Sequence, residues 1–363
     1  MDLETRLELV KGVGEEIITE DELIELLGTK LHPIAYDGFE PSGLAHLPFG
    51  VFRPLLLKDL SKAGVRFKLW LADSFAWINN KMGGDTNKIR KVGEYFIEVW
   101  KAAGVKEGRD VQFLWASDAF SDKEYWKKVI LIAKNTTVSR ANRALTIMGR
   151  KEGEMQEVAQ YFYPMMQAAD IFYLDADICQ LGLDQRRANM LARDIAEKKK
   201  WKKPVVVSHH MLMGLEGIKQ PEGYEENKQM DIEISSKMSK SKPHTAIFVH
   251  DSKEEIKRKI NSAFCPEKTV EGNPILDYSK HLVFRRFKSM KIERDKKFGG
   301  DLEFDDYQEL EKMFKDGKLH PMDLKNSVAD YLDQMIAPIR EHFEKNRKAK
   351  ELYDFVRKQE ITR

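Results

Sequence analysis

Short apolar runs alternate with longer segments of helical periodicity through the first two thirds of the chain. The apolar runs predict β-strands at residues 34–39, 66–73, 111–117, 177–182 and 204–210. Segments that follow several of these runs, at 86–103, 123–134 and 184–199, have the apolar spacing of amphipathic helices. This alternation predicts an α/β fold, with a parallel sheet covered by helices on both faces. Ligands bind such sheets at the carboxyl ends of the strands, so we expect the functional residues just after them.

The pattern changes near residue 250, where helical periodicity dominates and strand-like runs become rare. Residues 251–265 and 323–345 predict helices, and the first of them opens with an aspartate and a serine that can cap it. The charged stretch 217–236 lies just before residue 250 and has no periodicity. It predicts a long loop, and such loops in compact enzymes usually bind a ligand or move. We therefore expect two domains, residues 1–248 and the mainly helical residues 249–363.

Composition limits the classes of protein to which the chain can belong. Its 363 residues are 42% hydrophobic and 33% charged, as expected for a globular protein of two domains. The 61 basic and 59 acidic side chains nearly cancel, so any nucleic-acid site must be a local patch. The two cysteines, Cys179 and Cys265, lie in apolar contexts and predict reduced thiols in a cytoplasmic protein. No apolar run is long enough for a membrane span, and the acidic amino terminus is unlike a signal peptide.

The segment YFYPMMQAADIFYL, residues 161–174, places a polar stripe in apolar surroundings. In a helix, Tyr163, Gln167 and Asp170 stand at positions i, i+4 and i+7 and share one face. Buried polar groups need hydrogen-bond partners. The stripe therefore either satisfies neighbouring backbone groups or faces a small polar ligand, and the pattern leaves both readings open.

Two further segments lie where predicted strands end. In QLGLDQRR, residues 180–187, Gly182 lets a ligand approach the backbone and Asp184 can accept from sugar hydroxyls, although an ordinary capped helix has the same pattern. In YDGFEPSGLAHLPFG, residues 36–50, a turn brings His46 near the start of the next helix. A lone histidine is more often structural than catalytic, but its place after the first strand favours a role in catalysis.

The stretch SSKMSKSKPHT, residues 235–245, sets Lys237 and Lys240 three residues apart between small hydroxyl side chains. Mobile ammonium groups suit a reaction whose transition state spreads negative charge over phosphate oxygens. A solvated charged linker has a similar composition, so this stretch alone does not decide between the two.

Together these segments resemble the class I aminoacyl-tRNA synthetases, and specifically the tyrosyl-tRNA synthetases of the archaeal and eukaryotic cytosolic type. KMSKS, residues 237–241, is similar to the signature loop of that class, and HLPF, residues 46–49, occupies the place of its HIGH tetrapeptide. Further motifs follow the order of the family between about residues 30 and 345: YDGFEPSG, YPMMQAADIF, GLDQRR, AFCP, KFGGD and HPMDLKN. The resemblance implies a Rossmann-type catalytic domain, a helical anticodon-binding domain and the activity of a tyrosine–tRNA ligase.

The resemblance also implies roles for individual residues. The phenol of L-tyrosine would lie between Tyr36 and Asp170, with its ammonium group among Tyr163, Gln167 and Gln185. ATP would be the second substrate, with magnesium on its phosphates, and we assign no metal-ligating residues in the protein. His46, Lys237 and Lys240 would be catalytic and would hold the triphosphate. Gly182 and Asp184 would bind the ribose. The resemblance also implies Gly38, Met238 and Ser239 as ATP-binding residues.

The partner implied by the resemblance is tRNA(Tyr). Residues 282–298 carry seven basic and two acidic residues with interleaved phenylalanines, a composition typical of an RNA-binding surface or of a solvated face over core aromatics. The resemblance places Phe298 and Asp323 at the first anticodon base, His320 close by, and Arg186 near the first acceptor-stem base pair. It also implies a homodimer with its interface at residues 118–160.

Some residues depart from the family pattern. Pro48 stands where the signature has a small residue, Phe49 replaces its second histidine, and Phe75 stands where a histidine is usual. A non-catalytic tRNA-binding relative is therefore the alternative function. A tryptophan-specific enzyme shares the fold and reaction, but Tyr36 with Asp170 favours a phenol over an indole.

Overall fold

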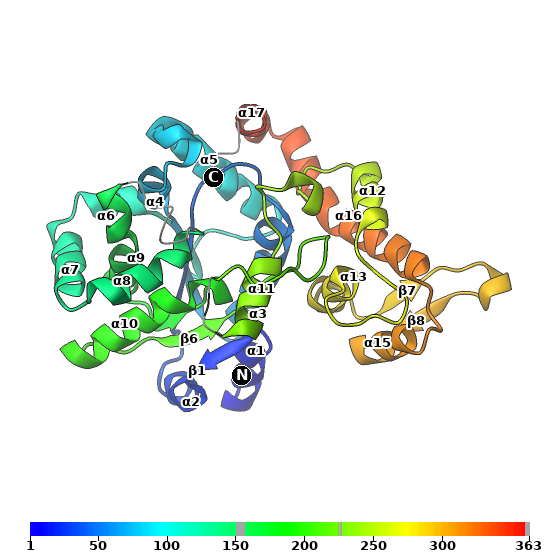
Figure 1. The fold of residues 1–363 in the computed structure, drawn as a ribbon, viewed down its shortest axis with the longest axis horizontal. Coiled ribbons are helices and arrows are strands. Elements are labelled where there is room, and N and C mark those ends of the chain that lie inside the picture. The colour runs from blue at the N-terminus through cyan, green and yellow to red at the C-terminus, as the bar shows by residue number, and fades with distance from the viewer. Residues whose placement is uncertain (150–156, 224, 226, 360–363) are drawn as a thin grey trace.

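A mostly parallel sheet organises the first two thirds of the computed structural model, which describes residues 1–149, 157–223, 225 and 227–359 (Figure 1). Its strands are β1 (Glu16–Ile18), β2 (Ile34–Phe39), β3 (Arg66–Leu71), β4 (Val111–Trp115), β5 (Ile178–Cys179) and β6 (Val205–Ser208). They lie in the order β1-β6-β5-β2-β3-β4. The five strands predicted from apolar runs all form, and they pair in parallel. The sequence did not predict β1, which pairs antiparallel with β6 and is too short to show a period.

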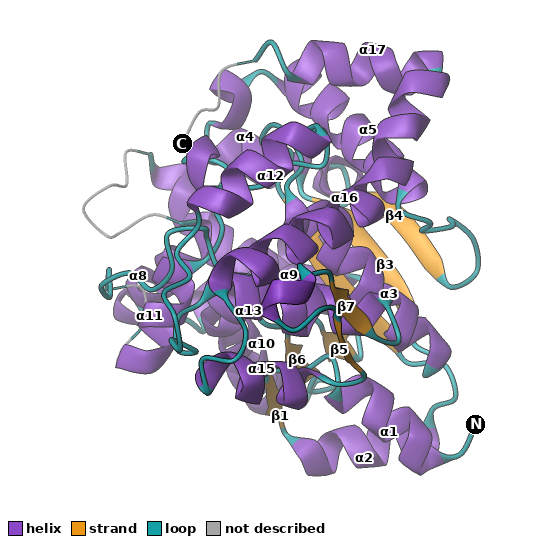
Figure 2. Cartoon of the chain, turned by 90° about the vertical axis from the view of Figure 1, so that its right-hand side faces the viewer, coloured by secondary structure: helices purple, strands orange, loops and turns teal. Residues whose placement is uncertain are grey.

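Both faces of the sheet are buried, because successive strand residues point to opposite sides. Ala35 and Val205 belong to one hydrophobic core, whereas Tyr36 and Val206 belong to a second. Figure 2 shows helices on both sides of the strands. These helices are α1 (Leu3–Lys11), α2 (Glu20–Thr29), α3 (Arg53–Lys62), α4 (Asp73–Ile78), α5 (Thr86–Ala102), α6 (Ala116–Phe120), α7 (Lys123–Lys134), α8 (Val138–Ala144), α9 (Tyr163–Tyr173) and α10 (Arg186–Lys199). The predicted α/β class is confirmed.

The carboxyl-terminal third is mainly helical, as predicted, and forms the right-hand side of Figure 1. Its helices are α12 (Lys253–Ser262), α13 (Pro274–Tyr278), α14 (Phe284–Arg286), α15 (Tyr307–Lys315), α16 (Pro321–Lys345) and α17 (Arg347–Val356), with one antiparallel hairpin of β7 (Met290–Ile292) and β8 (Leu302–Phe304). Helix α16 packs against α5 and α12, and its apolar residues join the core of one sheet face. The division into domains at residue 248 stays a prediction.

The expectation of one long loop over residues 217–236 is wrong for its second half. Helix α11 (Lys228–Ser236) occupies that half, and its first turn is capped by the side chain of Asn227, which accepts from the amides of Gln229 and Met230. The helix buries Ile234 and leads directly into Lys237, so the KMSKS loop begins at a helix end. Residues 224 and 226 of the stretch lie outside the described part of the chain. Across the described ranges, every helix is too short or too polar to span a lipid bilayer.

Candidate active site

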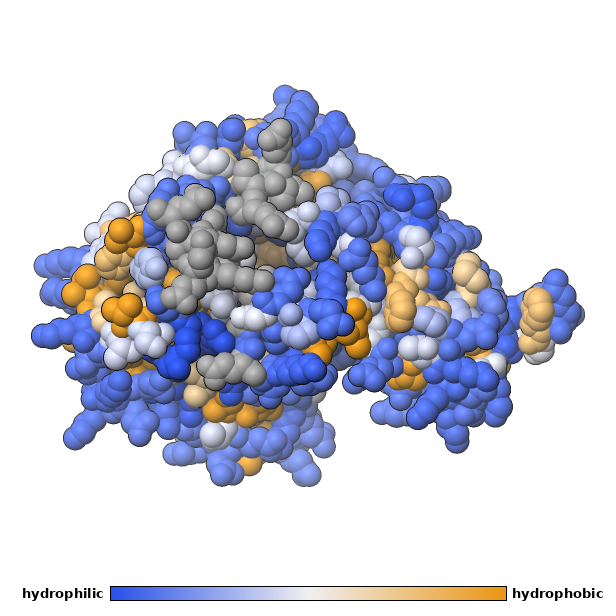
Figure 3. All heavy atoms as spheres, viewed as in Figure 1, coloured by the Kyte–Doolittle hydropathy of each residue, from blue (hydrophilic) through white to orange (hydrophobic). Residues whose placement is uncertain are grey.

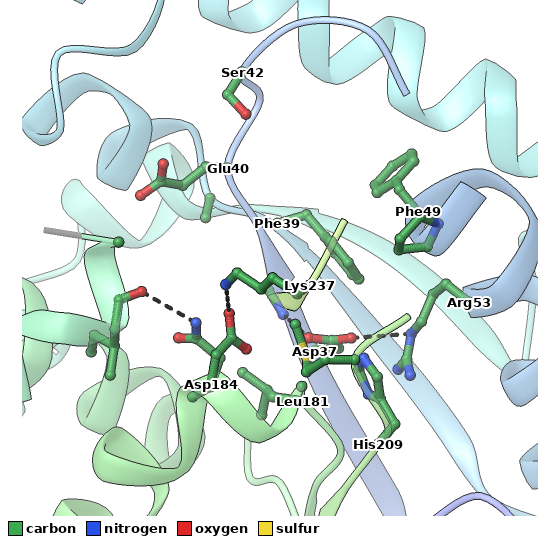
Figure 4. Close-up of a pocket in the computed structure, with 18 of the residues that line it drawn as sticks. Asp37, Phe39, Glu40, Ser42, Phe49, Arg53, Leu181, Asp184, His209 and Lys237 are labelled. Atoms are coloured by element: carbon green, nitrogen blue, oxygen red, sulfur yellow. Dashed lines mark hydrogen bonds and ion pairs between the residues drawn. The ribbon is translucent and has the colours of Figure 1, made fainter. Parts of the chain in front are cut away.

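A cavity of about 330 Å³ lies where β2, β3, β5 and β6 end, at the edge of the sheet that the sequence predicted (Figure 4). Among the residues lining it are all five tyrosine candidates and seven of the eight ATP candidates: Tyr36, Tyr163, Gln167, Asp170 and Gln185, with Gly38, His46, Gly182, Asp184, Lys237, Met238 and Lys240. Ser239 does not line the cavity and instead shares a 2.9 Å hydrogen bond with Ser241. Segments separated by more than 200 residues, such as those of Tyr36 and Lys240, thus converge on one site.

Tyr36 and Asp170 line one end of the cavity, and Tyr125 contacts Asp170 from outside the lining. Asp170 Oδ2 lies 3.5 Å from the hydroxyl of Tyr36, and Asp170 Oδ1 accepts from the hydroxyl of Tyr125 at 2.9 Å. All three side chains are buried, and burial raises the pKa of Asp170, although the bonds from both tyrosines oppose the change. Tyr125 was not predicted from the sequence, since a buried tyrosine of the amphipathic helix α7 has the same pattern as a core residue. This end of the cavity suits a ligand hydroxyl that can both donate and accept.

The predicted polar stripe of α9 does share one face, and that face lines the cavity. Tyr163 donates to Glu40 at 2.6 Å, and Gln167 donates to Gln185 at 3.1 Å. The ring of Phe75 packs edge-on against Tyr163 with centroids 4.8 Å apart, so this wall is apolar. Glu40 was not predicted from the sequence, and it adds a carboxylate on the side where the resemblance places an ammonium group.

At the other end of the cavity, the backbone is open to a ligand at Gly182. A Cβ atom there would lie only 2.7 Å from both Asp184 Oδ1 and Met211 Sδ, so no larger residue fits without displacement. Lys237 forms an ion pair with Asp184 across this opening (Figure 4). The pair joins two residues that the resemblance assigns to different parts of ATP.

His46 and Lys240 face each other near the same opening. Burial, followed by the charge of Lys240, lowers the pKa of His46 well below its ordinary value, so the imidazole is neutral. Lys240 donates to the hydroxyl of Ser42 at 3.0 Å and lies 5.1 Å from the ring centroid of Phe96. Burial, followed by repulsion from Lys81, lowers the pKa of Lys240 to about 8 although Glu40 opposes the shift. A bound anion would favour the charged form of Lys240 and could accept a hydrogen bond from neutral His46.

Pro48 and Phe49, which depart from the HIGH pattern, begin a short π-helical turn at residues Pro48–Phe52. Phe49 is buried in an aromatic cluster, 4.5 Å from the ring centroid of Trp100 and 4.2 Å from that of Phe96. Proline is well placed at the first position of such a turn, where its missing amide hydrogen costs nothing. The departures therefore supply an apolar part of the cavity lining near Lys240.

A polar network in the cavity wall also gave no signal in the sequence. The guanidinium of Arg53 lies 3.1 Å from Asp37 and also donates to Gln180, which lies 3.3 Å from His209 Nδ1. Burial raises the pKa of Asp37 to about 7, although the Arg53 charge opposes the change. No motif linked these residues, because α3, β2, β5 and β6 bring them together only in the folded chain (Figure 4).

The carboxylates lining the cavity already have partners within the described residues. Asp37 pairs with Arg53, Asp184 with Lys237, and Glu40 with the hydroxyl of Tyr163. These carboxylate oxygens do not form a metal site made of protein ligands alone. The arrangement fits instead a Mg²⁺ ion held mainly by nucleotide phosphates and water, as magnesium usually is.

The four residues predicted to contact RNA lie outside the cavity. Phe298 is 62% exposed, beneath the ammonium group of Lys297, whereas Phe284 and Phe287 pack against the core. At the start of α16, His320 is exposed and Asp323 is partly buried, and Arg294 links the Phe298 turn to this region by donating to the carbonyl of Lys318 at 3.3 Å. Of the three interleaved phenylalanines, therefore, only Phe298 is free to stack on a base.

Arg186, the fourth of these residues, stands at the start of α10. Its guanidinium lies 2.8 Å from Glu16 on β1, and both side chains are partly exposed. The strand that the sequence missed therefore supplies the partner of this arginine.

Comparisons with known proteins agree with one another. The family described as tRNA synthetases class I (W and Y) matches residues 29–221 and 230–337. Cytoplasmic tyrosine–tRNA ligase 2 of Arabidopsis thaliana is 46% identical over 99% of this chain, which spans only 46% of that relative's length. Tyrosine–tRNA ligase of Saccharolobus solfataricus is 45% identical over 99% of this chain and 98% of its own. The structure of tyrosyl-tRNA synthetase complexed with L-tyrosine from Pyrococcus horikoshii matches with a TM-score of 0.88 and 40% identity, covering 98% of this chain and 100% of that chain.

Proposed function

The chain belongs to the class I tRNA synthetases, within the branch of the tyrosine–tRNA ligases, and on that premise we propose that it activates L-tyrosine with ATP and transfers it to tRNA(Tyr). The observation that carries this proposal is the arrangement of one cavity. A phenol-sized polar end, formed by Tyr36 and Asp170, faces an anion-binding end with Lys237 and Lys240. Tyrosine and a triphosphate need these two kinds of group at opposite ends of one site.

In the first reaction, the tyrosine carboxylate attacks the α-phosphate of ATP in line, giving tyrosyl-adenylate and pyrophosphate. The carboxylate is already ionised at neutral pH, so the protein needs no general base and acts by positioning and charge stabilisation. Neutral His46 can donate one hydrogen bond to a phosphate oxygen, and the two lysines neutralise the charge of the leaving pyrophosphate. Magnesium bound to the phosphates would neutralise further charge there.

Lys237 must leave Asp184 to reach the phosphates, because the two form an ion pair in the ligand-free chain. Gly182 and Asp184 are then free to bind the ribose, since no side chain at residue 182 blocks the approach. The proposed ATP site includes Gly38 and Met238, which line the same cavity. It also includes Ser239, which follows Met238 in the chain but shares a hydrogen bond with Ser241 outside the lining.

The second reaction transfers the tyrosyl group to the terminal ribose of tRNA(Tyr). We assign Phe298, His320 and Asp323 to the anticodon end, since an exposed aromatic ring beside one exposed and one partly exposed polar side chain suits an unpaired base. Arg186 can contact the acceptor stem after exchanging Glu16 for a phosphate, to which guanidinium groups bind strongly.

We further propose that the chain is a cytoplasmic homodimer with an interface in residues 118–160. Apolar side chains are exposed in this segment: Ile130 on α7 is 54% exposed, Val138 on α8 is 75% exposed and Val158 is 78% exposed. Figure 3 shows apolar atoms at the edge of the molecule over α7 and α8. A second copy would remove this surface from water. Residues 150–156 of the segment lie outside the described part of the chain.

Tyrosine-dependent exchange of pyrophosphate into ATP, measured without tRNA, tests the proposed activity. We expect exchange with tyrosine and only background rates with phenylalanine or tryptophan, because Asp170 and Tyr36 lose their ligand partner when the phenol is absent. Exchange with tryptophan would assign the chain to the sister enzyme. Absence of exchange with all three amino acids would support the non-catalytic tRNA-binding alternative.

The pH dependence of the same reaction tests the role of Lys240. Its pKa of about 8 means that the ligand-free protein loses this positive charge as the pH rises above 8. If ATP binds only the protonated form, the KM for ATP increases about tenfold between pH 7 and pH 9. Lys240→Arg should flatten this profile, because a guanidinium stays protonated throughout that range. Identical profiles for the two proteins would contradict the assignment.

A further inference from the structure

The KMSKS loop is anchored at its first residues by a short piece of backbone that follows β6. Met213 lies opposite Lys237 in an antiparallel bridge. The amide of Met238 donates to the carbonyl of Leu212 at 2.8 Å, and the amide of Gly214 donates to the carbonyl of Ser236 at 2.8 Å. Residues 212–214 therefore determine where the loop begins.

The other side of this piece of backbone is held by the helical part of the chain. In an antiparallel bridge of this kind, the amide and carbonyl of the central residue point away from the partner strand. The amide and the carbonyl of Met213 each form a hydrogen bond with a side chain of α13, and the two side chains are consecutive in sequence. Asp277 Oδ2 accepts from the Met213 amide at 3.0 Å, and the hydroxyl of Tyr278 donates to the Met213 carbonyl at 2.6 Å.

A buried charge pair strengthens the same contact. His210 Nε2 lies 2.7 Å from Asp277 Oδ1, and its other ring nitrogen lies 3.4 Å from Glu233 on α11 and 3.8 Å from Glu15. Burial opposes protonation of His210, but Asp277 and then Glu233 outweigh it and raise the pKa of His210 to about 10. The imidazolium thus connects α13 with the helix that ends at the KMSKS loop.

We propose that Asp277 and Tyr278 are positioning residues for ATP: they hold Met213, and through it the start of the KMSKS loop, so that Lys237 and Lys240 face the nucleotide end of the cavity. This inference rests on the proposed tyrosine activation. Neither residue lines the cavity, so both act through the backbone of residues 212–214 rather than on substrate.

The same contact joins the ATP site to the surface assigned to the anticodon. Helix α13 packs against α16, and His320 and Asp323 stand at the start of α16. Tyr278 is fully buried, and the apolar residues of α13 and α16 share one core. Packed side chains of α13 and α16 therefore connect the backbone at Met213 with the surface assigned to the anticodon.

The test compares Tyr278→Phe with Tyr331→Phe, which is a matched control. Tyr331 accepts from the amide of Lys291 at 2.9 Å, so each variant removes one hydroxyl-to-backbone hydrogen bond from the helical part of the chain. Because such a bond contributes about 1 kcal/mol, we expect the KM for ATP in pyrophosphate exchange to rise about fivefold in Tyr278→Phe. The KM for tyrosine should change less than twofold, and Tyr331→Phe should resemble the unaltered protein.

Amide hydrogen exchange of residues 212–241, followed by mass spectrometry on the ligand-free protein, provides a readout independent of activity. Peptides that contain Gly214 and Met238 should exchange faster in Tyr278→Phe than in the unaltered chain or in Tyr331→Phe. An unchanged rate of amide hydrogen exchange in Tyr278→Phe would overturn the inference. Equal increases in the KM values for ATP and tyrosine would also overturn it. An unaltered protein without pyrophosphate exchange would refute the proposed function, while the amide measurement would still decide whether Tyr278 holds the loop.

Discussion

Replacing Lys237 with alanine is expected to slow tyrosyl-adenylate formation by a factor of about 10² to 10³, the usual effect of removing one group that stabilises transition-state charge. Lys237 reaches the cavity from the end of α11 and pairs there with Asp184, whereas Asp170 contacts Tyr36 and Tyr125. Tyrosine affinity, measured by calorimetry without ATP, should therefore change less than about twofold. The rate is best measured by rapid quench with saturating tyrosine and ATP.

Lys242→Ala is the matched control for this variant, because Lys242 belongs to the same loop and does not line the cavity. A similar loss of rate in both variants would mean that loop stability, rather than the Lys237 charge, is responsible. Lys240→Ala should behave like Lys237→Ala. An equal loss of tyrosine affinity and of rate would place these lysines at the amino acid instead of at the phosphates.

Replacing Asp170 with asparagine should lower kcat/KM for tyrosine about 30-fold, because a hydrogen bond to a charged group contributes about 2 kcal/mol. The substitution preserves shape and leaves one oxygen to accept from Tyr125, but the amide that replaces Oδ2 cannot accept a phenolic O–H. Phenylalanine makes no such bond, so its much lower kcat/KM should not change. Pyrophosphate exchange with each amino acid gives both values.

Tyr125→Phe tests whether Asp170 binds the phenol of the substrate or mainly holds neighbouring helices together. Tyr125 contacts Asp170 but does not line the cavity, so this variant should lower kcat/KM for tyrosine less than about threefold, because no bond to the substrate itself is lost. If Tyr125→Phe and Asp170→Asn have equal effects, Asp170 serves to order α7 against α9 rather than to read the phenol.

Much of the sheet could be predicted because local pattern determines it. Residues 34–39 and 123–134 form β2 and helix α7 with the predicted bounds. The errors occur where a local pattern is weak. The three residues of β1 are too few to show alternation, and the capping signal of Asn227 at the start of α11 was overlooked among charged neighbours.

Some residues of the candidate site could also be predicted from local sequence, and others could not. The polar face of α9 followed from spacing along a single helix, and Gly182 followed from its place at a strand end. Tyr125, Glu40 and Arg53 gave no such signal, because each meets its partner only after distant segments fold together.

By itself, the sequence determined the order of strands and helices, the polar face of α9, and the lysines of the KMSKS loop, since each depends on residues close together in the chain. Tertiary structure decided which of these residues share a cavity, which phenylalanine is exposed, and which side chains hold Met213. Asp277 and Tyr278 lie more than 60 residues from Met213 in sequence, and nothing local marks them as partners. Hydrogen bonds between residues so far apart in sequence depend on how the whole chain packs, because burial determines which polar groups must find partners.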